Sequence, residues 1–372
     1  MTNRPSQNLR RFVLATMCVL LILGSATSAT FAQSRAYVTN SSGDNTVSVI
    51  ATATNAVIAT IPVGFIPIAV AISPDNSRAW VLNLLDNGSI SVIDTATNTV
   101  IATISLGPFR SAIAFSPNGT RAYVSNFDSN ILEVIDTATF NVVAAIPVGV
   151  IPRDVAVTPD GTRVYVATSP ANQIVVIDAA TNTAINAIPV PKGAFDIAFT
   201  PDGTRAYVTN LDLSGFVSVI DTSSNTVIAE IPTATVPFGP GVQIVAITPD
   251  GTRAYVTNQI DDRVFVIDTA TNTVTTTIPL GTFSFPYGVA VTPDGLQVYV
   301  ANQGLGTVAI IDPITNTVIG SIPVGSNPTQ IAIMPSAPPM TKDDCKNGNF
   351  EKFLAPFGPF KNQGQCIKFV NK

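Results

Sequence analysis

The distribution of apolar and polar residues predicts a chain built from short β-strands. Between residues 34 and 335, apolar stretches of about five residues are separated by short stretches that contain Pro, Asp, Gly or Asn. The apolar stretches are rich in Val and Ile, whose branched side chains pack well on a pleated surface, and runs this short are typical of strands. The pattern therefore predicts an all-β protein with many tight turns.

The strand pattern repeats along almost all of this region. Residues 205–210 read Arg-Ala-Tyr-Val-Thr-Asn, and the aromatic position recurs every 42 to 48 residues. Its seven copies are Tyr37, Trp80, Tyr123, Tyr165, Tyr207, Tyr255 and Tyr299. A period in the forties made of short strands is typical of a β-propeller, in which each repeat forms one four-stranded blade. We therefore predict a seven-bladed β-propeller with antiparallel blades.

Two recurrent turns connect the strands of each predicted blade. A Pro-Asp-Gly turn, as at 201–203, joins the first and second strands. A turn of the form Asp-Thr-Ala-Thr-Asn-Thr joins the third and fourth strands, and Asp and Asn stabilise such reversals by bonding to nearby backbone groups. A row of aspartates at one local turn is therefore interpreted as structural and not as a set of metal ligands. These residues are Asp94, Asp136, Asp178, Asp221, Asp268 and Asp312.

The two ends of the repeat region predict how the ring closes. The region starts with a second strand at 35–40 and ends with an unpaired first strand at 329–333. We expect the last strand to complete the first blade, because closure removes the open sheet edges that promote aggregation.

The segments outside the repeats predict export and a small separate tail. Residues 1–32 have a basic start, an apolar core and small residues before Ala32, which is the pattern of a cleaved signal peptide. The expected domains are the signal at 1–32, the propeller at 33–335, a linker at 336–340 and a tail at 341–372. We expect a secreted protein, in the periplasm, outside the cell or on its surface, without a membrane span after cleavage. In that environment Cys345 and Cys366 are expected to form a disulfide.

The repeats resemble the YVTN family of β-propeller repeats, which occur in secreted and surface-associated bacterial and archaeal proteins. The resemblance covers about 34–335, and Tyr-Val-Thr-Asn stands unaltered in three repeats. Two repeats depart from it at two positions each, with Trp-Val-Leu-Asn at 80–83 and Tyr-Val-Ala-Thr at 165–168. The tail around Cys345 and Cys366 resembles a short segment found at the ends of other secreted bacterial proteins. The resemblance implies the fold, and most members look like scaffolds without an assigned reaction.

Charge and composition limit the partners and cofactors. The formal charge is −5, and because residues 1–32 and 336–372 each carry +3, the propeller region carries −11. Such a region repels phosphate backbones, so no nucleic-acid partner is expected. The chain has no histidine, which removes the commonest metal ligand and general base and disfavours a haem-bearing redox propeller. No cofactor is expected, although calcium remains open.

Ligands of propellers usually bind at the mouth of the central channel, where the loops that enter the first strands meet. Polar residues that differ between repeats at these positions are the candidate ligand-binding set, with no catalytic residue assigned and the metal unknown. Asp154 and Asp196 stand at equivalent positions of adjacent blades, so they could hold a cation or a polyol, or they could be solvated channel residues. The candidate residues are Arg110, Arg153, Asp154, Asp196, Gln243, Tyr287 and Gln330.

These patterns favour a non-catalytic scaffold that binds a protein or a cell-surface polymer, in an unknown oligomeric state. The alternative is a lactonase- or lyase-like propeller hydrolase that uses the channel-mouth carboxylates, with or without a divalent metal. A proline- and aromatic-rich insertion at 233–243 and the loop at 283–287 are expected to form one side of the channel mouth. Aromatic side chains there could stack on sugars, grip a peptide or cover the adjoining blades.

Overall fold

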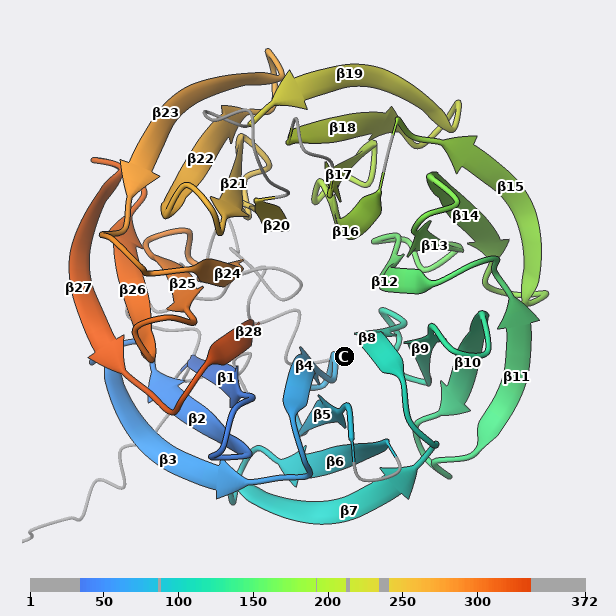
Figure 1. Ribbon diagram of the computed structural model, residues 1–372. Helices are drawn as coiled ribbons and strands as arrows, with labels where there is room; N and C mark the ends of the chain where they lie inside the picture. The colour runs from blue at the N-terminus through green and yellow to red at the C-terminus, as the bar shows by residue number, and fades with distance from the viewer. Residues whose placement is uncertain (1–33, 86–87, 192, 212–214, 234–240, 336–372) are drawn as a thin grey trace, which may run out of the picture. The chain divides into compact units, whose positions relative to one another are not determined.

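The computed structural model describes residues 34–85, 88–191, 193–211, 215–233 and 241–335. Of Val242, within the last range, only the backbone is described. Seven four-stranded antiparallel sheets follow one another around a ring, so the protein is a seven-bladed β-propeller, as predicted (Figure 1). The described residues contain no helix long and apolar enough to cross a membrane. The expected signal peptide and the Cys345–Cys366 tail lie outside the described residues.

The strands are grouped here by their position in the blade, from the channel outwards. The first strands are β4 (Pro67–Ile72), β8 (Arg110–Phe115), β12 (Pro152–Val157), β16 (Ala194–Phe199), β20 (Val242–Ile247), β24 (Pro286–Val291) and β28 (Pro328–Met334). The second strands are β1 (Arg35–Asn40), β5 (Arg78–Asn83), β9 (Arg121–Asn126), β13 (Arg163–Thr168), β17 (Arg205–Asn210), β21 (Arg253–Asn258) and β25 (Val298–Asn302).

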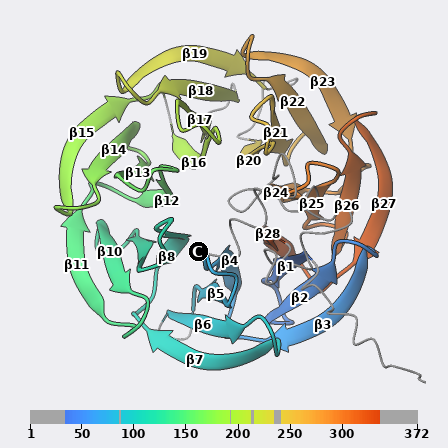
Figure 2. The ribbon, with the colours of Figure 1, turned by 180° about the vertical axis from the view of Figure 1, so that it is seen from behind.

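The outer half of each blade consists of the third and fourth strands (Figure 2). The third strands are β2 (Thr46–Ala51), β6 (Ser89–Asp94), β10 (Ile131–Asp136), β14 (Gln173–Asp178), β18 (Phe216–Asp221), β22 (Arg263–Asp268) and β26 (Thr307–Asp312). The fourth strands are β3 (Ala56–Pro62), β7 (Thr99–Ser105), β11 (Val142–Pro147), β15 (Thr183–Pro189), β19 (Thr226–Pro232), β23 (Thr273–Pro279) and β27 (Thr317–Pro323). Blade 1 is β28-β1-β2-β3, and blades 2 to 7 follow in chain order.

The ring closes as the ends of the repeat region predicted. Strand β28 pairs antiparallel with β1, with Arg35 opposite Met334 and Val38 opposite Ile331. The hydroxyl of Ser34 also donates a hydrogen bond of 2.8 Å to the carbonyl of Met334. The last strand of the chain therefore completes the first blade without a covalent connection.

Side chains of the repeated motif tie each blade to the next. The second and third strands are almost entirely buried, because both of their faces pack against neighbouring blades. The motif Arg donates to a turn carbonyl of the following blade, as Arg163 does to Thr222 at 2.9 Å. The motif Tyr donates to a turn Asn of the following blade, as Tyr207 does to Asn272 at 2.7 Å. These contacts explain why the same residues recur in most repeats.

The turn aspartates have the structural role that the sequence predicted. The Oδ1 atom of Asp178 accepts backbone N–H bonds from Ala180 and Thr181 at 3.0 and 2.8 Å. These bonds hold the reversal between the third and fourth strands. The antiparallel pairing places these turns and the Pro-Asp-Gly turns on one face of the ring, which we call the turn face. The loops that enter the first strands and those that join the second and third strands lie on the opposite face, the loop face.

Candidate functional site

The candidate site lies where every first strand contains a β-bulge. In β12, for example, Pro152 pairs with Thr168 and Val155 pairs with Val166, so Arg153 and Asp154 have no direct partner on β13. A bulge of this kind redirects side chains that regular alternation would place elsewhere. The same shift occurs in each of the other first strands. The bulges bring side chains from all seven blades together at the channel.

These side chains line a small cavity of about 50 Å³. Five of the seven candidate residues line it, namely Arg153, Asp154, Asp196, Tyr287 and Gln330. The remaining lining residues are Ile68, Ser111, Ala112, Phe195 and Ile244. One water molecule needs about 10–15 Å³ of such space, whereas pockets for small organic ligands measure about 300–1,000 Å³. The cavity therefore has room for a few water molecules or one ion.

Three of the polar cavity residues occupy one equivalent position and make the same contact. An Oδ2 atom of Asp154 accepts the backbone N–H of Ile197 in the next blade at 2.9 Å. Asp196 likewise accepts the backbone N–H of Val245 at 2.9 Å. The side-chain oxygen of Gln330 accepts the backbone N–H of Val70 at 3.1 Å, across the closure of the ring. One oxygen of each side chain therefore joins adjacent blades.

The surroundings of the two aspartates disfavour their charged forms. Burial raises the pKa of Asp154 to about 7, although the backbone N–H groups of Ile197 and Val155 lower it. Burial and then the nearby charge of Asp154 raise the pKa of Asp196 well above its usual range. Both shifts have the same sign because desolvation penalises the carboxylate. The pair therefore retains a proton near neutral pH.

Arg153 and Tyr287 complete the polar lining. The Nε atom of Arg153 is buried and has no hydrogen-bond partner among the described residues. Burial and the charge of Asp196 raise the pKa of Tyr287 to about 12, against an opposing effect of Arg153. The ring of Tyr287 meets that of Phe195 edge-on, with 6.3 Å between the centroids. Tyr287 therefore stays neutral and packs across the channel instead of joining Phe283 on the loop face.

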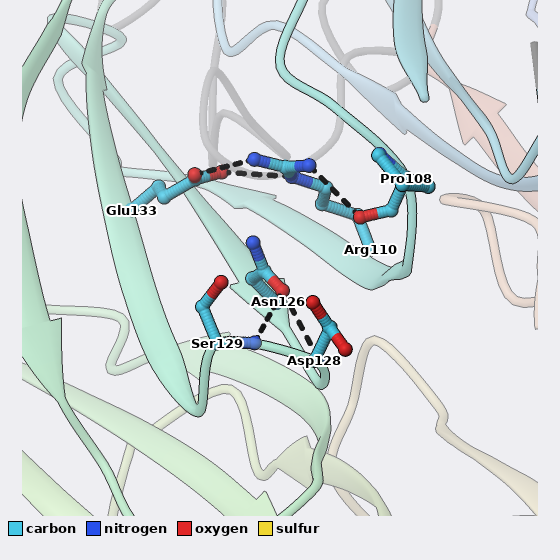
Figure 3. A network of polar contacts seen from close by, with 6 residues as sticks. All are labelled: Pro108, Arg110, Asn126, Asp128, Ser129 and Glu133. Atoms are coloured by element: carbon cyan, nitrogen blue, oxygen red, sulfur yellow. Dashed lines mark hydrogen bonds and ion pairs between the residues drawn. The ribbon is translucent and has the colours of Figure 1, made fainter. Parts of the chain in front are cut away.

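Arg110 does not reach the cavity. Its guanidinium donates to both oxygens of Glu133 on β10, at 3.0 and 2.6 Å, and to the carbonyl of Pro108 at 2.9 Å (Figure 3). Both side chains of this ion pair are less than a tenth exposed. Arg110 lies before the bulge, at a position where four of the other blades have Pro, and its side chain turns towards the outer strands of its own blade.

Gln243 does not line the cavity either. Its Nε2 atom donates to Oε1 of Gln259 at 3.3 Å, and Gln259 donates in turn to Gln303 at 2.8 Å. This chain of amides joins blades 6 and 7 at the ends of their second strands. In the part of the chain that the structure describes, no group of three or more carboxylate or cysteine side chains is placed to hold a metal ion.

A second feature is a set of exposed apolar side chains on the loop face, of which the sequence analysis identified only the loop at 283–287. Phe283 is 70% exposed and Phe65 is 53% exposed. The backbone of Phe109 and Phe285 has positive φ angles of 71° and 44°, which bulky residues adopt rarely. The exposed apolar residues of this face are Phe65, Leu85, Phe109, Val150, Ile260, Phe283, Phe285 and Leu305. The available signal was the presence of apolar residues in loops where other repeats have Gly or Asn.

Two family models match parts of the chain, each covering less than half of it. One is the choice-of-anchor I domain, matched over residues 130–289. The other is the seven-bladed β-propeller lactonase, matched over residues 70–187. That stretch includes Arg153 and Asp154 but ends before Asp196 and Tyr287. No curated protein matches the chain.

Solved structures share the fold at low sequence identity. Hydrazine synthase of Kuenenia stuttgartiensis is 22% identical with a TM-score of 0.66, over 73% of this chain and 96% of that chain. A functionally unknown protein of Desulfotomaculum acetoxidans is 18% identical with a TM-score of 0.69, over 81% and 99%. The dihydro-heme d1 dehydrogenase NirN is 16% identical with a TM-score of 0.60, over 80% and 74%. These likenesses show the β-propeller fold alone.

Proposed function

We propose that this protein is a secreted, non-catalytic β-propeller scaffold that binds a protein partner through its loop face. The observation that carries the proposal is that the channel carboxylates form hydrogen bonds between neighbouring blades. One carboxylate oxygen of Asp154 and one of Asp196 each accept a backbone N–H of the next blade. Both residues line a cavity of about 50 Å³. A space of this size excludes an organic substrate, which needs several hundred Å³.

The loop face supports the binding role. Its eight exposed apolar side chains come from blades 2, 3, 4, 6 and 7, and they occupy loops that differ between repeats. Exposed apolar groups rimmed by polar residues are typical of protein-binding surfaces. The fourth strands also expose Val and Ile, but they do so regularly around the ring, as Ile228 does. The irregular face is the one suited to selecting a partner.

Export and surface location form part of the same proposal. The signal-like segment 1–32 and the match to a choice-of-anchor I domain support them. The charge of −11 on the propeller region disfavours nucleic acid as a partner.

A crosslinking experiment tests the binding role. A photoreactive residue at position 283 is incubated with isolated cell envelopes of the source organism, and the same residue at position 228 serves as the control. We expect a protein adduct at 283 that excess wild-type protein abolishes and that excess F65S/F109S double variant does not. Equal adducts at both positions, or adducts to polysaccharide alone, would contradict the proposal.

The second candidate is a lactonase-like hydrolase. It is favoured by the family match at 70–187 and by a carboxyl group whose pKa lies near 7 in the channel. Lactone turnover that requires calcium or magnesium and disappears in Asp154→Ala would establish it. We expect no turnover across a panel of lactones and esters, with or without these metals.

A further inference from the structure

The turn face of blade 7 departs from the repeat. Blades 4, 5 and 6 have Pro-Asp-Gly-Thr-Arg in the first turn, whereas blade 7 has Leu296 and Gln297 at the last two positions. Its second turn has Pro313 and Ile314 where most other blades have Thr and Ala. Leu296 is 62% exposed and Ile314 is 81% exposed, the highest value among the large exposed apolar side chains. An apolar patch therefore stands at the turns of blade 7, where most other blades have Thr, Arg and Ala.

This patch borders a groove between two blades. The groove between blades 6 and 7 has a volume of about 520 Å³, and Pro313 and Ile314 form one of its walls. Asp250 and Asp294 also line it. The equivalent grooves between blades 2 and 3 and between blades 4 and 5 measure about 260 and 240 Å³. The groove that carries the apolar wall is thus about twice as large as these two counterparts.

The chain leaves the propeller on the same face and close to this groove. Strand β28 runs from the loop face to the turn face and ends at Met334, in the blade that adjoins blade 7. Residues 336–340 can span up to about 17 Å when extended, whereas packed sheets lie about 10 Å apart. The tail that starts at residue 341 is therefore within reach of the patch.

The composition of the tail complements the groove. Residues 336–372 carry six Lys against three acidic residues, whereas the propeller region carries −11. The same segment contains five phenylalanines, Phe350, Phe353, Phe357, Phe360 and Phe369. A segment of this length is too short to bury five phenylalanines in a core of its own. Its apolar and cationic groups need a surface that offers both apolar contact and carboxylates.

We propose that the C-terminal segment docks onto the turn face of its own propeller, in the groove between blades 6 and 7. Phenylalanines of the tail pack against Pro313 and Ile314, and lysines approach Asp250 and Asp294. The interaction is intramolecular, because the covalent connection gives the tail a high effective concentration at this groove. The loop face remains open to a partner.

Crosslinking in the full mature chain tests the site. A photoreactive residue at position 314 should crosslink to peptides from 341–372 within one chain, at a yield that does not change when the protein is diluted. The same residue at position 228, an exposed site on β19, should give no such product. A product whose yield falls on dilution would show docking to a second copy, and the absence of tail peptides at 314 would overturn the proposal.

Protease sensitivity gives an independent readout. Ile314→Lys places a like charge against the tail on an exposed turn, so the propeller itself should keep its unfolding midpoint. We expect tryptic cleavage within 341–372 to accelerate at least about fivefold relative to wild type, since protection falls with the population of the docked state. Ile228→Lys is the matched control and should cleave at the wild-type rate. Equal rates for all three proteins would contradict docking in this groove.

Discussion

The indole ring of Trp80 meets the ring of Phe140 edge-on across the interface of blades 2 and 3, with 5.6 Å between their centroids. At five other interfaces the same place holds a hydrogen bond from the motif Tyr to a turn Asn, such as the 2.5 Å bond from Tyr165 to Asn225. Phe140 even keeps the positive φ of the Asn that it replaces, at 61°. Both partners differ together, so this interface uses an aromatic pair where five others use a polar pair.

This exchange predicts coupling between the two positions. Trp80→Tyr leaves a cavity beside Phe140, and Phe140→Asn removes the aromatic contact, so each should lower the free energy of unfolding by about 1–3 kcal/mol. The double variant recreates the pair found elsewhere, and its loss should be smaller than the sum of the two by at least about 1 kcal/mol. Chemical denaturation of the four proteins measures this difference. Simple additivity would show that the pair is not a unit.

The closure of the ring predicts that the stability of the propeller depends strongly on β28. Truncation after Pro335 keeps β28 and should leave a cooperative unfolding transition. Truncation after Asn327 exposes the edge of β1 and removes buried Ile331 and Met334. We expect the second variant to lose its cooperative transition or to melt at least about 15 °C lower, because several kcal/mol of buried apolar contact are lost. Similar melting curves for the two truncations would refute noncovalent closure by β28.

The raised pKa values of Asp154 and Asp196 predict that the fold is less stable at pH 8 than at pH 5. The folded protein holds protons that the unfolded chain releases, so stability falls as the pH rises from about 4 through the folded pKa of Asp154, about 7. Asp154→Asn keeps an oxygen that can accept the backbone N–H of Ile197. It removes the cost of burying a charged carboxylate, because the amide is neutral. Since a tenfold change in proton affinity corresponds to about 1.4 kcal/mol, we expect it to raise stability at pH 8 by about 1–3 kcal/mol.

Glu230→Gln is the control for this experiment, because Glu230 is an exposed carboxylate on β19. It should leave the difference between pH 5 and pH 8 unchanged. If the wild type is equally stable at both pH values, the two channel aspartates are solvated and ionised, contrary to the prediction.

The buried ion pair of Arg110 and Glu133 predicts an asymmetric response to mutation. Arg110→Met leaves Glu133 buried without its partner and should cost about 3–5 kcal/mol of stability. The double variant Arg110→Pro with Glu133→Ser introduces the residues that blade 2 has at these positions, Pro67 and Ser91. Its stability should lie within about 1 kcal/mol of wild type. A double variant as unstable as the single one would show that blade 3 depends on the pair itself.

Much of the fold could be predicted from the sequence because the same pattern of strands and turns occurs in seven repeats. The period, the Pro-Asp-Gly turns and the unpaired strand at 329–333 were enough to predict seven blades and their closure. The site was less predictable, since the bulge breaks the alternation of side chains along each first strand. Arg110 stands one residue before Ser111, yet only Ser111 lines the channel. Spacing alone could not separate the two.

The size of the cavity and the contacts of its carboxylates depend on how neighbouring blades pack, which no single repeat encodes. Gln243 illustrates the difficulty. It occupies the same position as Arg153, but Gln259 at the end of β21 offers it a partner away from the channel. The patch at Leu296 and Ile314 was visible as a departure from the repeat, although its exposure was not.

Closure by β28 also makes the position of the chain ends exchangeable. Ser34 and Met334 are joined by a hydrogen bond within one sheet, and each of the other blades is continuous in the chain. A circular permutant that links residue 335 to residue 34 and opens the loop between β15 and β16 would complete blade 1 covalently. It would still retain all seven blade interfaces. The ring itself therefore has no first blade, and the junction of β28 and β1 is only one of several places where the chain can enter and leave it.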